Sequence, residues 1–141
     1  LGADSATADR RVEGMRALVH RQIKVGGAKQ RNIKALAHIT GGGLVDNVPR
    51  VLPDNLQAEI DGGSWQLPAV FQWLMKTGGV PTDDLIRTFN CGIGMIAVVA
   101  PEAVERVARV LSEHGETVRT IGRIIRRPRN GEGCVVKNVS W

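Results

Sequence analysis

Eight residues, Ala37 to Leu44, constrain this chain more than any other part of its sequence. They close an apolar run, residues 33–39, that predicts a strand, and they pass through three consecutive glycines. A short helical stretch follows, from Leu44 to Val48, and Pro49 ends it. This order is typical of a phosphate site, because glycines let a phosphate approach the backbone and the first N–H groups of a helix point toward it.

Two polar side chains are expected to join this glycine loop. His38 and Thr40 lie two residues apart on the incoming strand, so both should project from one face toward the loop. A plainer alternative is that the three glycines form a flexible connector and that His38 is packed within the strand. The residues alone leave both possibilities open, because the stretch matches neither of the standard glycine-rich nucleotide motifs.

The composition is that of a globular protein of one domain. Of the 141 residues, 43% are hydrophobic and 23% are charged, and no apolar run approaches the length of a membrane span. The first residues lack the basic flank and apolar core of a signal peptide. We therefore expect a cytoplasmic protein, in which Cys91 and Cys134 stay reduced, with a single disulfide between them as the alternative. Their spacing suits no metal site.

A net charge of +5 favours anionic partners, which are either nucleic acid or phosphorylated metabolites. The basic residues concentrate in two groups, one from Arg10 to Lys34 and the other from Arg119 to Arg129. Neither group is interleaved with the aromatic side chains that stack on bases. We therefore interpret both groups as solvated surface.

Helices and strands are predicted to alternate along the rest of the chain. Helices are expected over Asp9–Ile23, Pro68–Lys76, Pro81–Ile86 and Pro101–His114, and strands over Leu56–Ile60, Ile93–Val99, Thr117–Ile125 and Cys134–Val139. Residues 28–32 are expected to be a linker, and the continuously apolar run 93–99 a strand buried on both faces. Asn130-Gly131 predicts a hairpin between the last two strands. The alternation indicates an α/β fold, a mixed β-sheet packed with helices.

Three sequence blocks, in the same order, resemble the phosphoribosylformylglycinamidine cyclo-ligase family, also called AIR synthetase. They are KALAHITGGGLVDNVPRVLP (Lys34–Pro53), SWQLPAVFQWL (Ser64–Leu74) and RTFNCGIGMIAVV (Arg87–Val99), and GETVRTIGRI (Gly115–Ile124) fits as well. The resemblance implies an AIR-synthetase C-terminal-domain-like fold for residues 33–141. Residues 1–32 lack the P-T-x-x-Y-V segment usual in the family, so they are expected to be an N-terminal extension and helix.

The resemblance implies an ATP-dependent ligase reaction of de novo purine biosynthesis. With Mg²⁺ present, this family uses ATP to activate the formyl amide oxygen of formylglycinamidine ribonucleotide as a phosphate. The amidine nitrogen then attacks and closes the imidazole ring of aminoimidazole ribonucleotide. Most ATP and metal ligands belong to the N-terminal domain of the family, and the full enzyme is a homodimer. This chain is therefore expected to be the substrate- and phosphate-binding half, inactive without an ATP-binding N-terminal domain.

The resemblance also implies a set of site residues. His38 and Asn90 match positions expected to orient the amide or the phosphate, which is a catalytic role. Contacts to phosphate or substrate are expected from Thr40, Gly41, Gly42, Gly43, Asn47, Arg50, Arg87 and Gly92. No metal ligand is expected, and the adjacent acids Asp83 and Asp84 are interpreted as a helix start. Trp65, Phe71 and Trp73 are expected in the core or at a domain interface.

Two alternatives belong to other classes of protein. One is a basic module that binds nucleic acid or another partner through the same fold, although three Trp, two Phe and no Tyr offer few stacking side chains. The other is a fragment without activity that covers an exposed apolar face by self-association.

Overall fold

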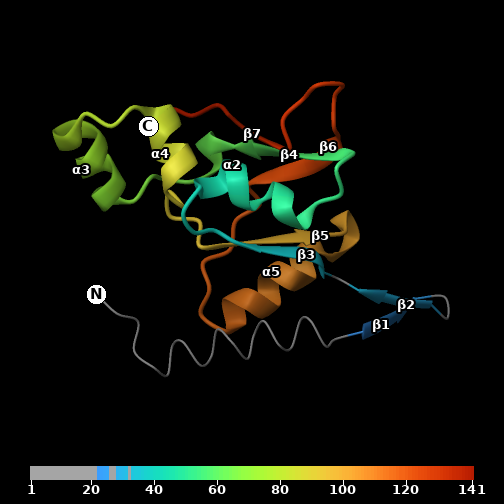
Figure 1. Cartoon of the computed structure of the whole chain (residues 1–141). Coiled ribbons are helices and arrows are strands. Elements are labelled where there is room, and N and C mark those ends of the chain that lie inside the picture. The colour runs from blue at the N-terminus through green and yellow to red at the C-terminus, as the bar shows by residue number, and fades with distance from the viewer. Residues whose placement is uncertain (1–21, 26–27, 32) are drawn as a thin grey trace. The chain divides into compact units, whose positions relative to one another are not determined.

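The computed structural model describes residues 22–25, 28–31 and 33–141 (Figure 1). The chain divides into two units, one made of Leu1–Lys34 and Ala97–Arg119 and the other of Ala35–Ile96 and Thr120–Trp141. The division passes through β3 (Ile33–His38) and β5 (Met95–Val99), which pair in a two-stranded sheet. All residues of the expected site belong to the second unit.

A three-stranded mixed sheet forms the frame of the second unit (Figure 1). β4 (Leu56–Asp61) lies at its centre, with β6 (Gly122–Arg126) antiparallel on one side and β7 (Cys134–Lys137) parallel on the other. The alternating pattern of β4 predicted this strand, and its apolar residues Ala58 and Ile60 are buried. The fold class predicted from the sequence, a mixed sheet packed with helices, is confirmed.

The predicted hairpin between the last two strands is wrong. The tight turn favoured by Asn-Gly is present, with Asn130 at φ 60° and the Gly131 N–H donating to the Pro128 carbonyl at 2.9 Å. The strands on either side of it nevertheless pair with the two edges of β4 and not with each other. A turn sequence fixes only the local reversal of the chain, whereas strand partners depend on which apolar faces must be buried. The predicted strand from Thr117 begins only at Gly122.

Short helices accompany this sheet in the second unit. They are α2 (Gly43–Asn47), the 3₁₀ turns η1 (Pro49–Val51) and η2 (Gly62–Ser64), α3 (Ala69–Gly78) and α4 (Thr82–Thr88). The three predicted helices are thereby confirmed, with ends shifted by one or two residues. Their packing differs, because α2 and α4 contribute buried residues and α3 contributes none.

The side chains of α3 and of the tryptophans lie differently from what the sequence predicted. Two large apolar residues of α3 lie in solvent, since Val70 is 57% exposed and Trp73 is 61% exposed. A core position for Trp73 is therefore wrong, whereas its alternative position at a domain interface stays a prediction. Trp65 is buried as expected, and Phe71 packs against Phe89 with ring centroids 5.8 Å apart.

The core of the second unit is built from the elements that flank the glycine loop. Its most completely buried side chains are Leu44, Val48, Leu85, Cys91 and Cys134. They come from α2 and the residue after it, from α4 and the loop that follows, and from β7. The loop that was expected to hold a phosphate is therefore anchored directly on the core.

In the first unit, two strands replace predicted non-strand structure. β1 (Gln22–Val25) pairs antiparallel with β2 (Ala28–Arg31), so the linker predicted over residues 28–32 is wrong. The predicted helix Asp9–Ile23 lies mostly outside the described residues, and its last two residues belong to β1. β-branched residues such as Ile23 and Val25 favour strands, which agrees with the strand observed over Gln22–Val25.

The first unit also holds the clearest helix of the chain. The predicted helix Pro101–His114 is confirmed as η3 (Pro101–Ala103) followed by α5 (Val104–Glu113). Its buried residues are Ala103, Val107, Val110 and Leu111. The expectation that β5 is buried on both faces is wrong, because Met95 is 47% exposed and the other β5 residues are only half-buried. No helix among the described residues is long and apolar enough to cross a membrane.

Candidate functional site

The glycine loop has a backbone that two of its three glycines make possible. Gly42 has φ 93° and Gly43 has φ 59°, in the left-handed region that residues with a Cβ rarely adopt. The Gly43 N–H donates to the Thr40 carbonyl at 3.1 Å, which closes the loop at the start of α2. Gly41 differs, because a Cβ at this exposed position would meet nothing within 4 Å. Space for a ligand beside the loop backbone is therefore open at Gly41.

Gly43 joins the first sequence block to the third. A Cβ at this position would overlap the Ile86 carbonyl oxygen and lie 2.9 Å from that of Phe89, at the end of α4. The strand before the loop makes a second connection, since the Ile39 N–H donates to the Gly94 carbonyl at 3.0 Å. The structure thus brings together two motifs that are about fifty residues apart in the sequence.

Asn47 occupies the interior of the loop. The residue is only 5% exposed. Its Nδ2 donates to the carbonyl oxygens of Thr40 at 3.3 Å, Gly41 at 3.1 Å and Gly43 at 2.8 Å. Its Oδ1 accepts from Arg50 Nη1 at 3.2 Å and, at the longer distance of 3.5 Å, from the Thr40 hydroxyl. The side chain therefore connects the loop backbone to Thr40 and Arg50.

His38 and Thr40 lie as the strand periodicity predicted. Both are exposed and the intervening Ile39 is 2% exposed, so the two polar side chains share the outward face. The alternative in which His38 is packed within the strand is therefore wrong. His38 has no hydrogen bond or ion pair to another described residue, so its imidazole is accessible from solvent.

Asn90 and Gly92 shape the second loop of the candidate site. Asn90 Oδ1 accepts a hydrogen bond from the Gly92 N–H at 3.0 Å, and its Nδ2 has no partner among residues 33–141. Gly92 has φ 94°, and a Cβ there would lie 2.6 Å from Pro68 Cγ. Gly92 is thus required by the backbone and by packing, while the amide nitrogen of Asn90 retains its donors.

Arg87 lies on the exposed side of α4. Its Nη2 is 3.5 Å from Glu132 Oε1, and more than half of each side chain is exposed to solvent, so this ion pair is weak. Both residues line a small open cavity of about 210 Å³, together with Asp83, Cys134 and four apolar or backbone neighbours. The weak ion pair directs Arg87 toward the residues that precede β7.

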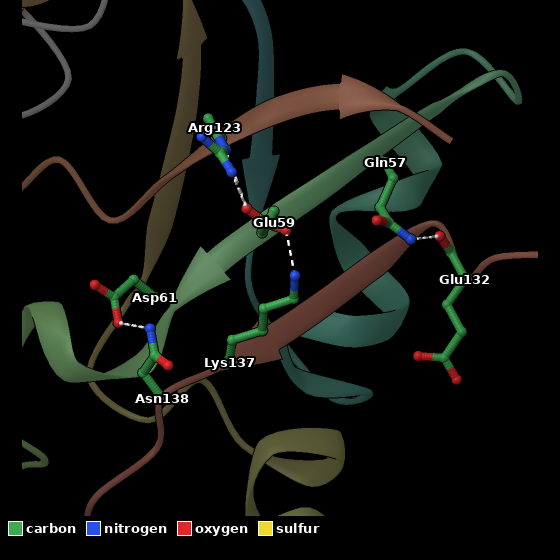
Figure 2. Close-up of polar contacts among 7 residues, drawn as sticks. All are labelled: Gln57, Glu59, Asp61, Arg123, Glu132, Lys137 and Asn138. Atoms are coloured by element: carbon green, nitrogen blue, oxygen red, sulfur yellow. Dashed lines mark hydrogen bonds and ion pairs between the residues drawn. The ribbon is translucent and has the colours of Figure 1, made fainter. Parts of the chain in front are cut away.

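A second polar cluster lies on the three-stranded sheet and was not predicted (Figure 2). Glu59 Oε1 accepts from Arg123 at 3.0 Å (Nε) and 2.7 Å (Nη2), and its Oε2 accepts from Lys137. These two cations lower the pKa of the Glu59 carboxyl, with Lys137 the larger cause. The cluster borders an open groove of about 320 Å³, to which Asp61 and Asn138 also contribute.

The sequence signal for this cluster was only partial. The alternation in β4 puts Gln57 and Glu59 on its polar face, but their partners lie 64 to 78 residues away in the sequence. Gln57 shares the polar face with Glu59, yet it is only 5% exposed, and its Nε2 donates to the Glu132 carbonyl at 2.6 Å. Figure 2 shows this contact beside the ion pairs.

Both cysteines are free and buried, as the sequence predicted for reduced thiols. Burial raises the pKa of Cys91 to about 11, and burial together with nearby Glu132 raises that of Cys134 to about 12. Neither thiol is therefore a nucleophile at neutral pH. Within the described part of the chain, no three His, Cys, Asp or Glu side chains gather as a possible metal site.

This geometry defines a class of protein: an α/β domain whose glycine loop follows a strand and packs against the end of a helix. Comparison of the sequence with family models identifies the family: residues 2–134 match the AIR synthase related protein, C-terminal domain. The chain therefore belongs to this family, as the sequence blocks predicted.

Two curated relatives are similar to this chain. The bifunctional purine biosynthetic protein PUR2,5 of Pichia angusta is 58% identical over 106 residues, which are 75% of this chain and 13% of that protein. The bifunctional purine biosynthetic protein ADE5,7 of Saccharomyces cerevisiae is 48% identical over 110 residues, 78% of this chain and 14% of that protein. The chain thus spans about one-seventh of the length of these relatives. These matches do not favour the nucleic-acid alternative.

Proposed function

We propose that this chain is the substrate- and phosphate-binding part of an ATP-dependent ligase. The proposed reaction cyclises formylglycinamidine ribonucleotide to aminoimidazole ribonucleotide in purine biosynthesis. Family membership and two relatives named for purine biosynthesis support the assignment. The observation that carries the proposal is structural: Gly43 packs against the end of α4, so the glycine loop and the Asn90 loop lie on one core.

The glycine loop is proposed to bind a phosphate. Gly41 is open to a close approach, and the exposed Thr40 hydroxyl and Arg50 guanidinium both lie within hydrogen-bond distance of the same Asn47 oxygen. A phosphate is small enough to contact the hydroxyl and the guanidinium together, and an arginine fork suits its oxygens. Gly42 and Gly43 serve by conformation, since their positive φ values shape the loop.

His38 and Asn90 are proposed to orient the reacting amide. The imidazole of His38 is exposed at the end of β3, and the Nδ2 of Asn90 has free donors beside the ordered Gly92 turn. Both groups donate or accept hydrogen bonds without taking part in the core. Arg87 adds positive charge on α4, where its ion pair with Glu132 is exposed enough to exchange for an anionic substrate.

ATP and Mg²⁺ are proposed to be held mainly by an N-terminal domain outside this chain. ATP supplies the phosphoryl group that activates the formyl oxygen. The described residues do not fit a magnesium site, because no acidic or histidine cluster lies among them, so we assign no step to a metal held here. The full enzyme is proposed to be a cytoplasmic homodimer, and residues 33–141 its C-terminal domain.

Isothermal titration calorimetry with formylglycinamidine ribonucleotide tests this function. The expected result is weak binding by the chain alone and tighter binding, with turnover of ATP, when an ATP-binding N-terminal domain is added. Absence of binding under both conditions would contradict the proposal. A matched pair of variants locates the site: Arg50→Met should weaken binding about tenfold or more, whereas Arg126→Met removes another exposed charge and should not.

A further inference from the structure

Asn47 is expected from the sequence to touch the ligand, yet its hydrogen-bonding capacity is already occupied. The amide has two N–H donors, and they serve three loop carbonyls, those of Thr40, Gly41 and Gly43. The oxygen has two lone pairs, and they accept from Arg50 and Thr40. Since the residue is 5% exposed, a ligand has neither a free polar atom nor surface to contact.

Arg50 differs from Asn47, because most of its hydrogen-bond donors are not used within the loop. It is exposed, and its one hydrogen bond to a described residue is from Nη1 to Asn47 Oδ1 at 3.2 Å. A guanidinium has five N–H donors in a rigid fork, so most of them remain for an anion. The hydrogen bond to the buried Asn47 oxygen fixes the plane of the guanidinium. Arg50 therefore loses less conformational entropy when it binds an anion.

We infer that Asn47 is a positioning residue, which fixes the shape of the glycine loop and directs Arg50 toward the bound phosphate without touching it. This inference rests on the proposed function, because it concerns the same phosphate site. The amide connects five groups. Its nitrogen holds three loop carbonyls, which sets where Gly41 presents its backbone, and its oxygen holds the Thr40 hydroxyl and the Arg50 guanidinium beside that backbone. The physical advantage is preorganisation, which raises affinity without adding a contact.

Titration of the 141-residue chain with inorganic phosphate, followed through the backbone amide resonances of Gly41, tests the inference. The variant Asn47→Leu keeps the shape of the side chain and removes both polar groups. Its matched control is Gln57→Met, which likewise removes a buried amide, also 5% exposed, that holds a backbone carbonyl. A merely structural role predicts similar consequences for both variants.

The expected result is a loss of phosphate affinity of about tenfold or more in Asn47→Leu and wild-type affinity in Gln57→Met. In an Arg50→Met background the Asn47→Leu change should cost less, because part of its effect acts through Arg50. Wild-type affinity in Asn47→Leu would overturn the inference and leave the proposed function standing. Absence of phosphate binding by the wild-type chain would count against both.

A measurement on the unaltered chain covers the case in which Asn47→Leu does not fold. Saturation with phosphate should shift the Arg50 Nε–H and Asn47 Nδ2 resonances together with the Gly41 amide, and leave the Gln57 Nε2 resonances in place. A shift at Gly41 with unmoved Asn47 and Arg50 signals would contradict the positioning role. These signals report coupling inside the site and do not depend on stability.

Discussion

The two polar clusters of the second unit differ in burial and in the separation of their partners along the chain. The cluster around Asn47 has a buried side chain at its centre and joins residues at most seven positions apart. In the cluster around Glu59 the acidic side chain is 17% exposed and its two cations are mostly exposed, and the partners lie 64 and 78 positions away in the chain. The first ties a loop to its own helix, and the second ties three strands together.

This contrast shows which polar contacts contribute most to the free energy of unfolding. A buried amide that loses its partners leaves carbonyl groups without hydrogen bonds, and each such group is expensive. An exposed ion pair that is lost is replaced by water at little cost. We therefore expect substitutions in the Asn47 cluster to change the free energy of unfolding strongly and substitutions in the Glu59 cluster to change it weakly.

The largest effect is expected from Gly43→Ala. The added Cβ would meet the Ile86 carbonyl oxygen and would also occupy a positive φ, so the loop and α4 must separate. We expect a loss of about 3 kcal/mol or more in the free energy of unfolding, measured by urea denaturation. Gly41→Ala, where the space is open, should cost less than about 1 kcal/mol. Equal losses would mean that the loop is not pinned to α4.

A smaller effect is expected from Asn47→Leu. We expect it to lower the free energy of unfolding by about 2–3 kcal/mol, because several carbonyls, including that of Gly43, lose their donor. Gln57→Met removes a single hydrogen bond to the Glu132 carbonyl and should cost about 1–2 kcal/mol in the same denaturation experiment. A smaller loss in Asn47→Leu than in Gln57→Met would mean that the additional hydrogen bonds of Asn47 do not add to the free energy of unfolding.

The smallest effect is expected from Glu59→Gln, and it should depend on pH. The pKa of Glu59 is lowered from its ordinary value of 4.5 in the folded chain, so its ion pairs stabilise the fold above that value. The stabilisation is lost as the pH falls through the lower folded pKa. The melting temperatures of wild type and Glu59→Gln should therefore differ slightly near neutral pH and converge in acid.

Salt offers an independent check on the same pair of proteins. Added sodium chloride should reduce the difference in melting temperature between wild type and Glu59→Gln, because exposed ion pairs are screened. It should leave the difference in melting temperature between wild type and Asn47→Leu unchanged, because hydrogen bonds between neutral buried groups are not screened by salt. A salt-insensitive Glu59 effect would show that the sheet cluster behaves like a buried one.

Much of the candidate site could be predicted from the sequence, because its parts are local. The strand, the glycine loop and the short helix follow each other within about fifteen residues, and β-alternation alone placed His38 and Thr40 on one exposed face. The resemblance to the AIR synthase family rested on such blocks, and the family match confirms it. The role of Asn47 could not be predicted, since a motif gives the residue type but not which of its atoms are occupied.

The pairing of strands and the burial of individual side chains could not be predicted from the sequence. Asn130-Gly131 makes its turn, yet β6 and β7 pair with opposite edges of β4, and residues 22–31 form paired strands where a helix end and a linker were predicted. Trp73 has the chemistry of a core residue and is exposed, while Gln57 has that of the surface and is buried.

What the sequence determined by itself is the chain's family, its glycine loop and most of its helices, because these depend on neighbouring residues. What only the tertiary structure decided is which strands meet, that Gly43 closes onto α4, and that Asn47 faces inward while Arg50 remains free for a ligand. The physical reason is that burial and pairing are settled by competition among all apolar surfaces of the unit, which no local pattern records.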